Sequence, residues 1–219
     1  MRLHPAPRDT SRMRRRVLHG AAASMLLASG IAHAEKLRAT PANALGPFYP
    51  AQKPVDIDAD LTRVAGRAGV AHGTILYVTG RVLDTGGRPQ GGATLELWQA
   101  NAFGRYIHPA DSDASGPLDP DFQGYGTLRA GSDGQFRIKT IKPPPYSGRT
   151  PHIHFIVAGG RTRLTTQMFF EGEPRNERDG LYRHLAAEDR RASTGRFIDR
   201  ARGAEDGSVA VTWDIVLPG

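Results

Sequence analysis

The apolar segment at residues 153–158 constrains the fold most, because its residue types favour a strand. It reads Ile-His-Phe-Ile-Val-Ala, and β-branched and aromatic residues of this kind are enriched in strands. A second apolar segment, 164–170, follows across Gly159-Gly160-Arg161. A short connection that contains glycine between two such segments is typical of a hairpin. The sequence therefore predicts two antiparallel strands here.

Two histidines, His152 and His154, lie on either side of Ile153 in the first of these strands. Because side chains alternate along a strand, both imidazoles point to one face while Ile153 points to the other. Two imidazoles on one face can converge on one ion, and neutral imidazole suits zinc, copper, iron and nickel. The alternative is a pair of surface histidines on an exposed strand.

Two tyrosines and an arginine near this strand narrow the choice of metal. Tyr146 follows three prolines that fix the preceding loop, Tyr106 lies upstream, and Arg149 places a cation beside the histidines. A free phenol has a pKa of about 10, so phenolate binding at neutral pH requires a strongly Lewis-acidic ion, and ferric iron fits best. The chain has no cysteine and no haem motif. Each tyrosine taken singly is more simply a half-buried aromatic with a hydrogen-bonded hydroxyl.

The 219 residues allow one domain, and 26 glycines and 16 prolines favour an all-β architecture with many turns. We expect a β-sandwich of mainly antiparallel strands with long active-site loops and an extended N-terminal arm. A short helix is expected at 179–191 and one or two helical turns at 56–65. The segment 109–121 shows no packing signature. Further strands are expected at 74–84, 93–99, 135–141 and 209–217.

The first 34 residues resemble an export signal and are kept out of the fold. Arginines 14–16 precede a mostly apolar stretch, and Ala32-His33-Ala34 matches a cleavage motif. The adjacent arginines indicate the Tat route to the periplasm. The alternative is a membrane anchor, but an apolar stretch of about 12 residues is too short to span a bilayer. We expect three segments: the signal at 1–34, the arm at 35–72 and the β-sandwich domain at 73–219.

Most of the positive charge belongs to this leader. Residues 1–34 hold six arginines and one aspartate, so only +2 of the formal net charge of +7 remains for the rest of the chain. We therefore expect no nucleic-acid partner. We also expect no stable membrane anchor, and the lack of cysteine excludes a disulfide framework.

Several short motifs follow one another between residues 40 and 182. They are Gly-Pro-Phe-Tyr-Pro at 46–50, Gly-Arg-Val at 80–82, Leu-Trp-Gln-Ala-Asn-Ala-Phe-Gly-Arg-Tyr at 97–106, Phe-Gln-Gly at 122–124, Arg-Thr-Pro-His-Ile-His-Phe at 149–155 and Thr-Gln-Met-Phe-Phe at 166–170. In this order and combination they resemble the intradiol ring-cleavage dioxygenases of the protocatechuate 3,4-dioxygenase type. Each motif alone is weak, but the combination is specific.

This resemblance implies a β-sandwich that holds one mononuclear non-haem Fe(III) ion. In the family, two tyrosinates and two imidazoles bind this ion. Carried over to this chain, the tyrosinates are Tyr106 and Tyr146, and the imidazoles are His152 and His154. All four residue types are present at matching positions.

The same resemblance implies three catalytic side chains. Tyr146 leaves the iron when a catechol binds and takes one of the catechol protons. Arg149 stabilises the charge that develops on the ring, and Gln167 matches a glutamine of the family that supports the site. The implied reaction uses O2 to cleave the ring between its two hydroxyl-bearing carbons, giving a cis,cis-muconate-type product.

Two departures from the family pattern bear on the substrate. Phe169 stands where family members often carry tyrosine, and five residues separate Tyr146 from His152. The implied assembly is a homo-oligomer or a hetero-oligomer with a related chain. Two other functions stay open. One is a non-catalytic β-sandwich ligand-binding module with a vestigial metal site. The other is a zinc or copper enzyme that uses the two histidines with a carboxylate, which is disfavoured because no Asp or Glu adjoins them.

Overall fold

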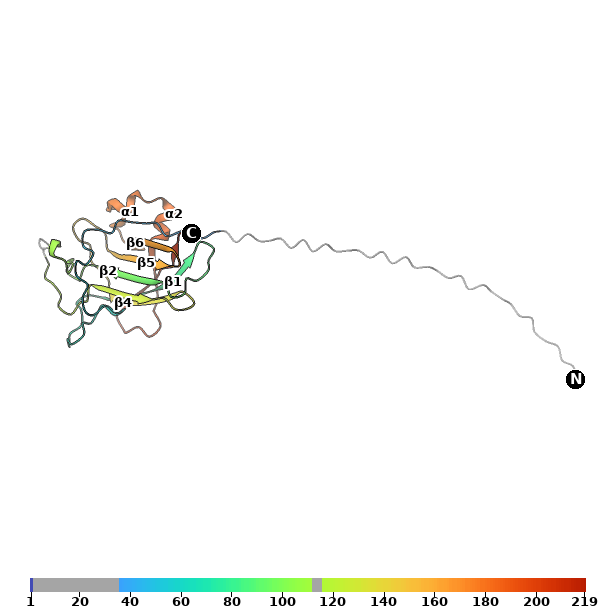
Figure 1. Ribbon diagram of the computed structural model, residues 1–219, viewed down its shortest axis with the longest axis horizontal. Helices are drawn as coiled ribbons and strands as arrows, with labels where there is room; N and C mark the ends of the chain where they lie inside the picture. The colour runs from blue at the N-terminus through green and yellow to red at the C-terminus, as the bar shows by residue number, and fades with distance from the viewer. Residues whose placement is uncertain (2–35, 112–115) are drawn as a thin grey trace. The chain divides into compact units, whose positions relative to one another are not determined.

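The computed structural model describes residue 1, residues 36–111 and residues 116–219, and strands dominate these parts (Figure 1). Among them, nine strands form one nearly closed sheet in the order β3-β2-β5-β6-β7-β8-β1-β4, with β9 beside β1. Five strand pairs are antiparallel and three are parallel, so the predicted all-β class is confirmed. The strands are β1 (Ile75–Asp84), β2 (Thr94–Trp98), β3 (Tyr125–Arg129), β4 (Gln135–Ile141), β5 (His152–Gly159), β6 (Thr162–Phe170), β7 (Thr194–Ile198), β8 (Val209–Thr212) and β9 (Ile215–Leu217).

The two halves of this sheet pack against each other around one core. Strands β2, β3, β5 and β6 form one half, strands β1, β4, β7 and β8 form the other, and β6 pairs with β7 in parallel to join them. The core combines side chains from both halves, such as Leu97 and Phe155 with Val78 and Ile138. Burial of each such side chain stabilises the fold by about 1.5–3 kcal/mol. The predicted β-sandwich is confirmed.

The predicted hairpin lies in the middle of the first half. Strand β5 pairs antiparallel with β6, and the register places His152 opposite Phe169 and His154 opposite Gln167. Strand β5 is almost entirely buried because β2 and β6 pair with its two edges. The strand predicted at 135–141 agrees with β4 residue for residue. The strands predicted at 74–84 and 93–99 agree with β1 and β2 to within one residue at each end.

The helical turns expected at 56–65 are absent, and that prediction was wrong. The chain there forms turns and extended stretches instead. Its backbone pairs with two strands, since the Leu61 N–H donates to the Lys139 carbonyl at 2.8 Å and the Thr127 N–H donates to the Ile57 carbonyl at 2.6 Å. These bonds use backbone groups that a helix would pair within itself.

The sequence pattern does not reveal β3 or β7, and it merges β8 with β9. Strand β3 contains Gly126, where an added Cβ would lie 2.5 Å from the carbonyl oxygen of Asp58. A glycine weakens the sequence pattern of a strand. Gly126 is nevertheless required here, because a larger residue would clash with the backbone of Asp58 in the arm. The single strand predicted at 209–217 is interrupted because the Asp214 side chain, not a backbone carbonyl, accepts the Arg81 N–H at 2.8 Å.

The helix expected at 179–191 consists of two short helices that Figure 1 shows beyond β6. They are α1 (Gly180–His184) and α2 (Ala187–Ala192), and the extended conformation of Leu185 and Ala186 separates them. The described residues also contain two 3-10 turns, η1 (Pro109–Asp111) and η2 (Asn176–Arg178).

The segment 109–121, which shows no packing signature in the sequence, does pack in its described residues, because Asp111 and Asp119 are buried. In the part of the chain that the structure describes, no helix combines the length and apolar character needed to cross a membrane. The export signal predicted at 1–34 lies, apart from Met1, outside the described residues.

Candidate metal centre

The four predicted metal ligands meet at one point although they come from three parts of the chain. His152 and His154 lie on β5, Tyr146 lies in the loop before it, and Tyr106 lies in the loop after β2. The two tyrosine oxygens are 3.3 Å apart, and the Tyr146 oxygen is 3.3 Å from His152 Nε2. The Nε2 atoms of the two histidines are 3.2 Å apart. The alternation along β5 therefore directs both imidazoles to one face.

These separations fit four ligands of one ion. Nitrogen and oxygen ligands placed tetrahedrally at about 2.1 Å from a metal are about 3.4 Å apart. The tautomer of His152 agrees, because its Nδ1 lies 2.6 Å from the Thr150 carbonyl oxygen and must donate to it. Nε2 of His152 therefore keeps its lone pair. His154 Nδ1 is buried without a hydrogen-bond partner among the described residues. The two phenol oxygens and the two Nε2 nitrogens are therefore a set of donor atoms that fits a cation.

Burial sets the protonation states of these groups. Burial, helped by the charge of Arg149, lowers the pKa of His152 to about 4, and burial holds the pKa of His154 well below its usual value. Both imidazoles are therefore neutral at pH 7 and able to bind a metal. Burial raises the pKa of both Tyr106 and Tyr146, so phenolate binding requires a strongly Lewis-acidic cation.

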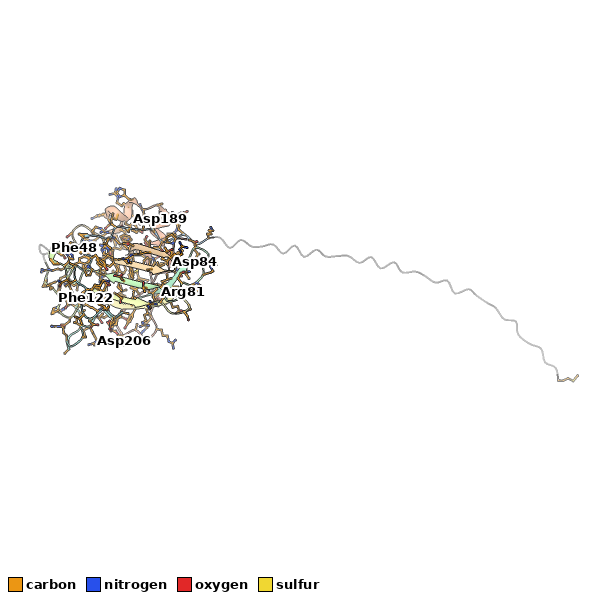
Figure 2. The ribbon with its side chains drawn as sticks, viewed as in Figure 1. Phe48, Arg81, Asp84, Phe122, Asp189 and Asp206 are labelled. Carbon is orange, nitrogen blue, oxygen red and sulfur yellow. The ribbon has the colours of Figure 1, made fainter. Side chains whose placement is uncertain are left out.

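The two tyrosines are held differently. Tyr106 is 2% exposed, and its backbone N–H donates to the buried carboxylate of Asp111 at 2.7 Å. Tyr146 is half-buried. The ring of Phe48, labelled in Figure 2, lies with its centroid 4.9 Å from that of Tyr106 and 6.3 Å from that of Tyr146. The arm residue Phe48 therefore forms a wall beside both phenols.

Strand β2 and the arm hold His154 in place. The ring of Trp98 stacks on its imidazole at 4.8 Å with an interplanar angle of 11°. Tyr49 meets Trp98 edge-on at 5.0 Å, and its hydroxyl donates to Glu96 at 2.7 Å. Gly46 approaches the same imidazole, since an added Cβ would lie 3.0 Å from His154 Cε1. The stacking of Trp98 and the close approach of Gly46 both restrict the orientation of the His154 imidazole.

The two remaining predicted residues bond to each other. Arg149 Nη2 donates to Gln167 Oε1 at 2.7 Å, and Gln167 Nε2 donates to the Ala44 carbonyl at 3.0 Å. Arg149 Nε donates to Asp179 at 2.7 Å. Arg149 is close enough that its charge shifts the pKa of all four candidate ligands. The structure thus brings all the predicted site residues together.

Three residues of this site have no role in the sequence analysis: Asp111, Trp98 and Asp179. An aspartate directly before a helix is a common N-cap, so Asp179 had a local signal for a helix start. Trp98 lies in the motif at 97–106, but nothing local indicated its stacking on His154 or the bond of Asp111 to Tyr106, because these contacts arise from strand pairing and loop packing. Among the described residues, no group of three or more His, Cys, Asp or Glu side chains could hold a metal, so a zinc or copper site completed by a carboxylate gains no support there.

Two histidines and two tyrosines converging in a β-sandwich define a candidate non-haem metal protein. Comparison with known proteins narrows this class, because a dioxygenase family model matches residues 45–219. The chain belongs to the intradiol ring-cleavage dioxygenase family.

Two curated relatives show the range of this similarity. The chain is 40% identical over 185 residues to the protocatechuate 3,4-dioxygenase beta chain of Burkholderia cepacia, covering 79% of this chain and 77% of that one. It is 32% identical over 176 residues to the hydroxyquinol 1,2-dioxygenase of Rhizobium sp. (strain MTP-10005), covering 72% of this chain and 56% of that one. The chain therefore spans little more than half of the second relative.

Solved structures share the fold. The dioxygenase domain of a dioxygenase carbohydrate-binding protein fusion from Streptomyces sp. SirexAA-E is 31% identical, with a TM-score of 0.62 over 83% of this chain and 99% of that one. An intradiol ring-cleavage dioxygenase from Tetranychus urticae is 22% identical, with a TM-score of 0.63 over 83% of this chain and 95% of that one. The second likeness concerns the fold alone.

Proposed function

We propose that this chain is a mononuclear non-haem Fe(III) dioxygenase that cleaves a catecholic ring between its two hydroxyl-bearing carbons. Both atoms of O2 enter the product, which is of the cis,cis-muconate type. The observation that carries the proposal is the convergence of Tyr106, Tyr146, His152 and His154 in a chain of the intradiol family. When bound, the iron supplies a Lewis acid and a template that orients the substrate.

The unequal exposure of the tyrosines supports separate roles. Tyr106 is buried and anchored by its backbone, so we assign it, with His152 and His154, to holding the ion. Tyr146 is half-buried, and the next residue, Ser147, has a positive φ of 43° that few side chains adopt. We assign Tyr146 to accepting a proton from a catechol hydroxyl at its Oη atom.

Arg149 supplies a positive charge that is already in place before the substrate arrives. Its side chain is 23% exposed, and Gln167 holds one end of the guanidinium. A fixed cation favours the deprotonated catechol and stabilises negative charge that develops on a ring oxygen. We assign Arg149 to this electrostatic role and Gln167 to orienting it.

The proposed substrate is a small catechol, in keeping with the protocatechuate, hydroxyquinol and catechol in the names of the relatives. Because the Burkholderia cepacia relative is a beta chain, we propose an oligomer formed with further copies or with a related chain. We propose no nucleic-acid partner and no stable membrane anchor. Residues 1–34 support the proposal of export to the periplasm by the Tat route, which cell fractionation with arginines 14–16 changed to lysine would test.

Metal and product analysis of the purified protein tests the reaction. We expect iron to be retained and the iron-loaded protein to consume O2 with catechol, protocatechuate or hydroxyquinol, releasing a ring-opened product with two new carboxyl groups. Retained iron without turnover of any catechol would favour the binding module with a vestigial site. Selective retention of zinc or copper would contradict the proposal.

A further inference from the structure

Asp179, which the reaction described above does not use, is a buried carboxylate bonded to Arg149. Its side chain is 0% exposed, and its Oδ2 atom accepts from Arg149 Nε at 2.7 Å. The same oxygen accepts from the backbone N–H of Thr150 at 2.9 Å. A charge-assisted bond in a buried place is stronger than a surface ion pair, so this contact constrains the arginine.

The other oxygen attaches Asp179 firmly to the fold. Its Oδ1 atom accepts from the backbone N–H of Leu181 at 2.9 Å and of Tyr182 at 3.1 Å, which makes Asp179 the N-cap of α1. Burial alone would raise the pKa of Asp179, but the bonds from Thr150 and Arg149 outweigh it and lower the pKa. The carboxylate is therefore charged at neutral pH and has a fixed orientation.

Gln167 accepts a hydrogen bond from a second nitrogen of the Arg149 guanidinium. Its Oε1 accepts from Arg149 Nη2 at 2.7 Å, while its Nε2 donates to the Ala44 carbonyl of the arm at 3.0 Å. Asp179 therefore accepts a hydrogen bond from Nε of Arg149, and Gln167 accepts one from Nη2. Nη1 of Arg149 makes no hydrogen bond to the described residues. Two bonds to a planar group fix its plane as well as its position.

We propose that Asp179 is a positioning residue that fixes the guanidinium of Arg149 and leaves Nη1 for an anionic oxygen of the bound catechol. This inference rests on the proposed function, and it assigns Asp179 an action through Arg149 only. A mobile arginine would have to be ordered in each turnover, whereas the clamped one is preorganised for the charge that develops.

Asp179→Asn separates this role from helix capping. Asparagine caps helices about as well as aspartate, so the bonds to Leu181 and Tyr182 can remain. If the amide oxygen keeps the capping bonds, the amide NH2 group faces the Arg149 Nε–H and the Thr150 N–H, which are also donors. The negative charge beside Arg149 is lost as well. We expect kcat to fall roughly a hundredfold with little change in KM, because displacement of a catalytic group acts mainly on the transition state. Asp206→Asn makes the same change at an exposed ion pair with Arg200 and should have no effect (Figure 2).

A double-mutant cycle decides how Asp179 acts. If it acts through Arg149, then Asp179→Asn added to Arg149→Ala should slow turnover no further than Arg149→Ala alone. The iron content and the visible spectrum of each variant should match those of the original protein. Multiplicative losses in the double variant, or loss of iron from Asp179→Asn, would overturn the inference.

The same experiment distinguishes a failure of the proposed function from a failure of the inference about Asp179. Full activity of Arg149→Ala would contradict the role of Arg149 in the proposed function, whereas full activity of Asp179→Asn alone would overturn only the inference. If Asp179→Asn does not fold, Asp179→Ser keeps a capping oxygen and replaces it in the cycle. If neither variant folds, Asp179 belongs to the folding of α1 and the inference is overturned.

Discussion

Tyr106 and Tyr146 are both candidate ligands, but only Tyr146 is accessible enough to exchange its partner. We predict that Tyr146→Phe retains iron and turns over roughly a hundredfold more slowly, because it loses the proton acceptor at Oη. Tyr106→Phe is the matched control, and we expect it to lose iron, since the buried ligand has no replacement. Iron content and kcat of both variants check this. Equal loss of iron from both would remove the distinction between the tyrosines.

The buried histidines make the metal-free protein sensitive to acid. His152 has a pKa of about 4 in the folded chain, below its usual 6.5. As the pH falls from 6.5 towards 4, the unfolded chain binds a proton that the folded chain excludes, so stability falls, by roughly 3 kcal/mol in total. Urea unfolding of the chelated protein at several pH values measures this. His152→Asn should lack that part of the pH dependence, and identical profiles would contradict the assignment.

Sequence reasoning located the donor atoms of the site better than the groups that hold them. His152 and His154 follow from the strand period, and the tyrosines and Arg149 follow from motif order. The roles of Asp111 and Trp98 could not be predicted, because a loop carboxylate that accepts the Tyr106 N–H and a ring that stacks on His154 depend on tertiary packing. A local sequence pattern contains no information on such contacts.

At the level of elements, the predictable parts are those with a clear period and a short connection. The hairpin β5–β6 has both, and its register carries His154 next to Gln167. The part of the arm at 56–65 has no clear period and no short connection. Its conformation is set by hydrogen bonds to distant strands, such as that from Leu61 to Lys139. Strand β3 was missed for the same reason, since Gly126 serves the arm that crosses it.

Glycine at the junction of arm and site offers a test at this scale. Gly46 and Gly66 have nearly the same positive φ, 80° and 79°, but an added Cβ meets His154 only at Gly46 and nothing within 4 Å at Gly66. We predict that alanine at either position lowers the free energy of unfolding by about 1–2 kcal/mol. Only Gly46→Ala should also weaken iron binding and activity. Equal iron affinity in both variants would show that Gly46 does not constrain the imidazole.

Across the whole molecule, the site joins segments that are far apart in the chain. The bond between Gln167 and Ala44 spans 123 residues, and the candidate ligands lie in two loops and on β5. An unfolded chain cannot present these groups together, so metal binding favours the folded state. We predict that iron at about one hundred times its Kd raises the free energy of unfolding by about 2.7 kcal/mol. Calorimetry with and without a chelator measures this, and His154→Asn should show no such gain.

The most direct test of the central claim is the visible absorption spectrum of the iron-loaded protein, recorded without oxygen before and after addition of a catechol. Ferric iron bound by Tyr106 and Tyr146 predicts a coloured protein with a tyrosinate-to-iron charge-transfer band, and binding of the catechol to the ion predicts a shift of that band. A protein that is colourless in both states would contradict the ferric tyrosinate centre and with it the proposed reaction.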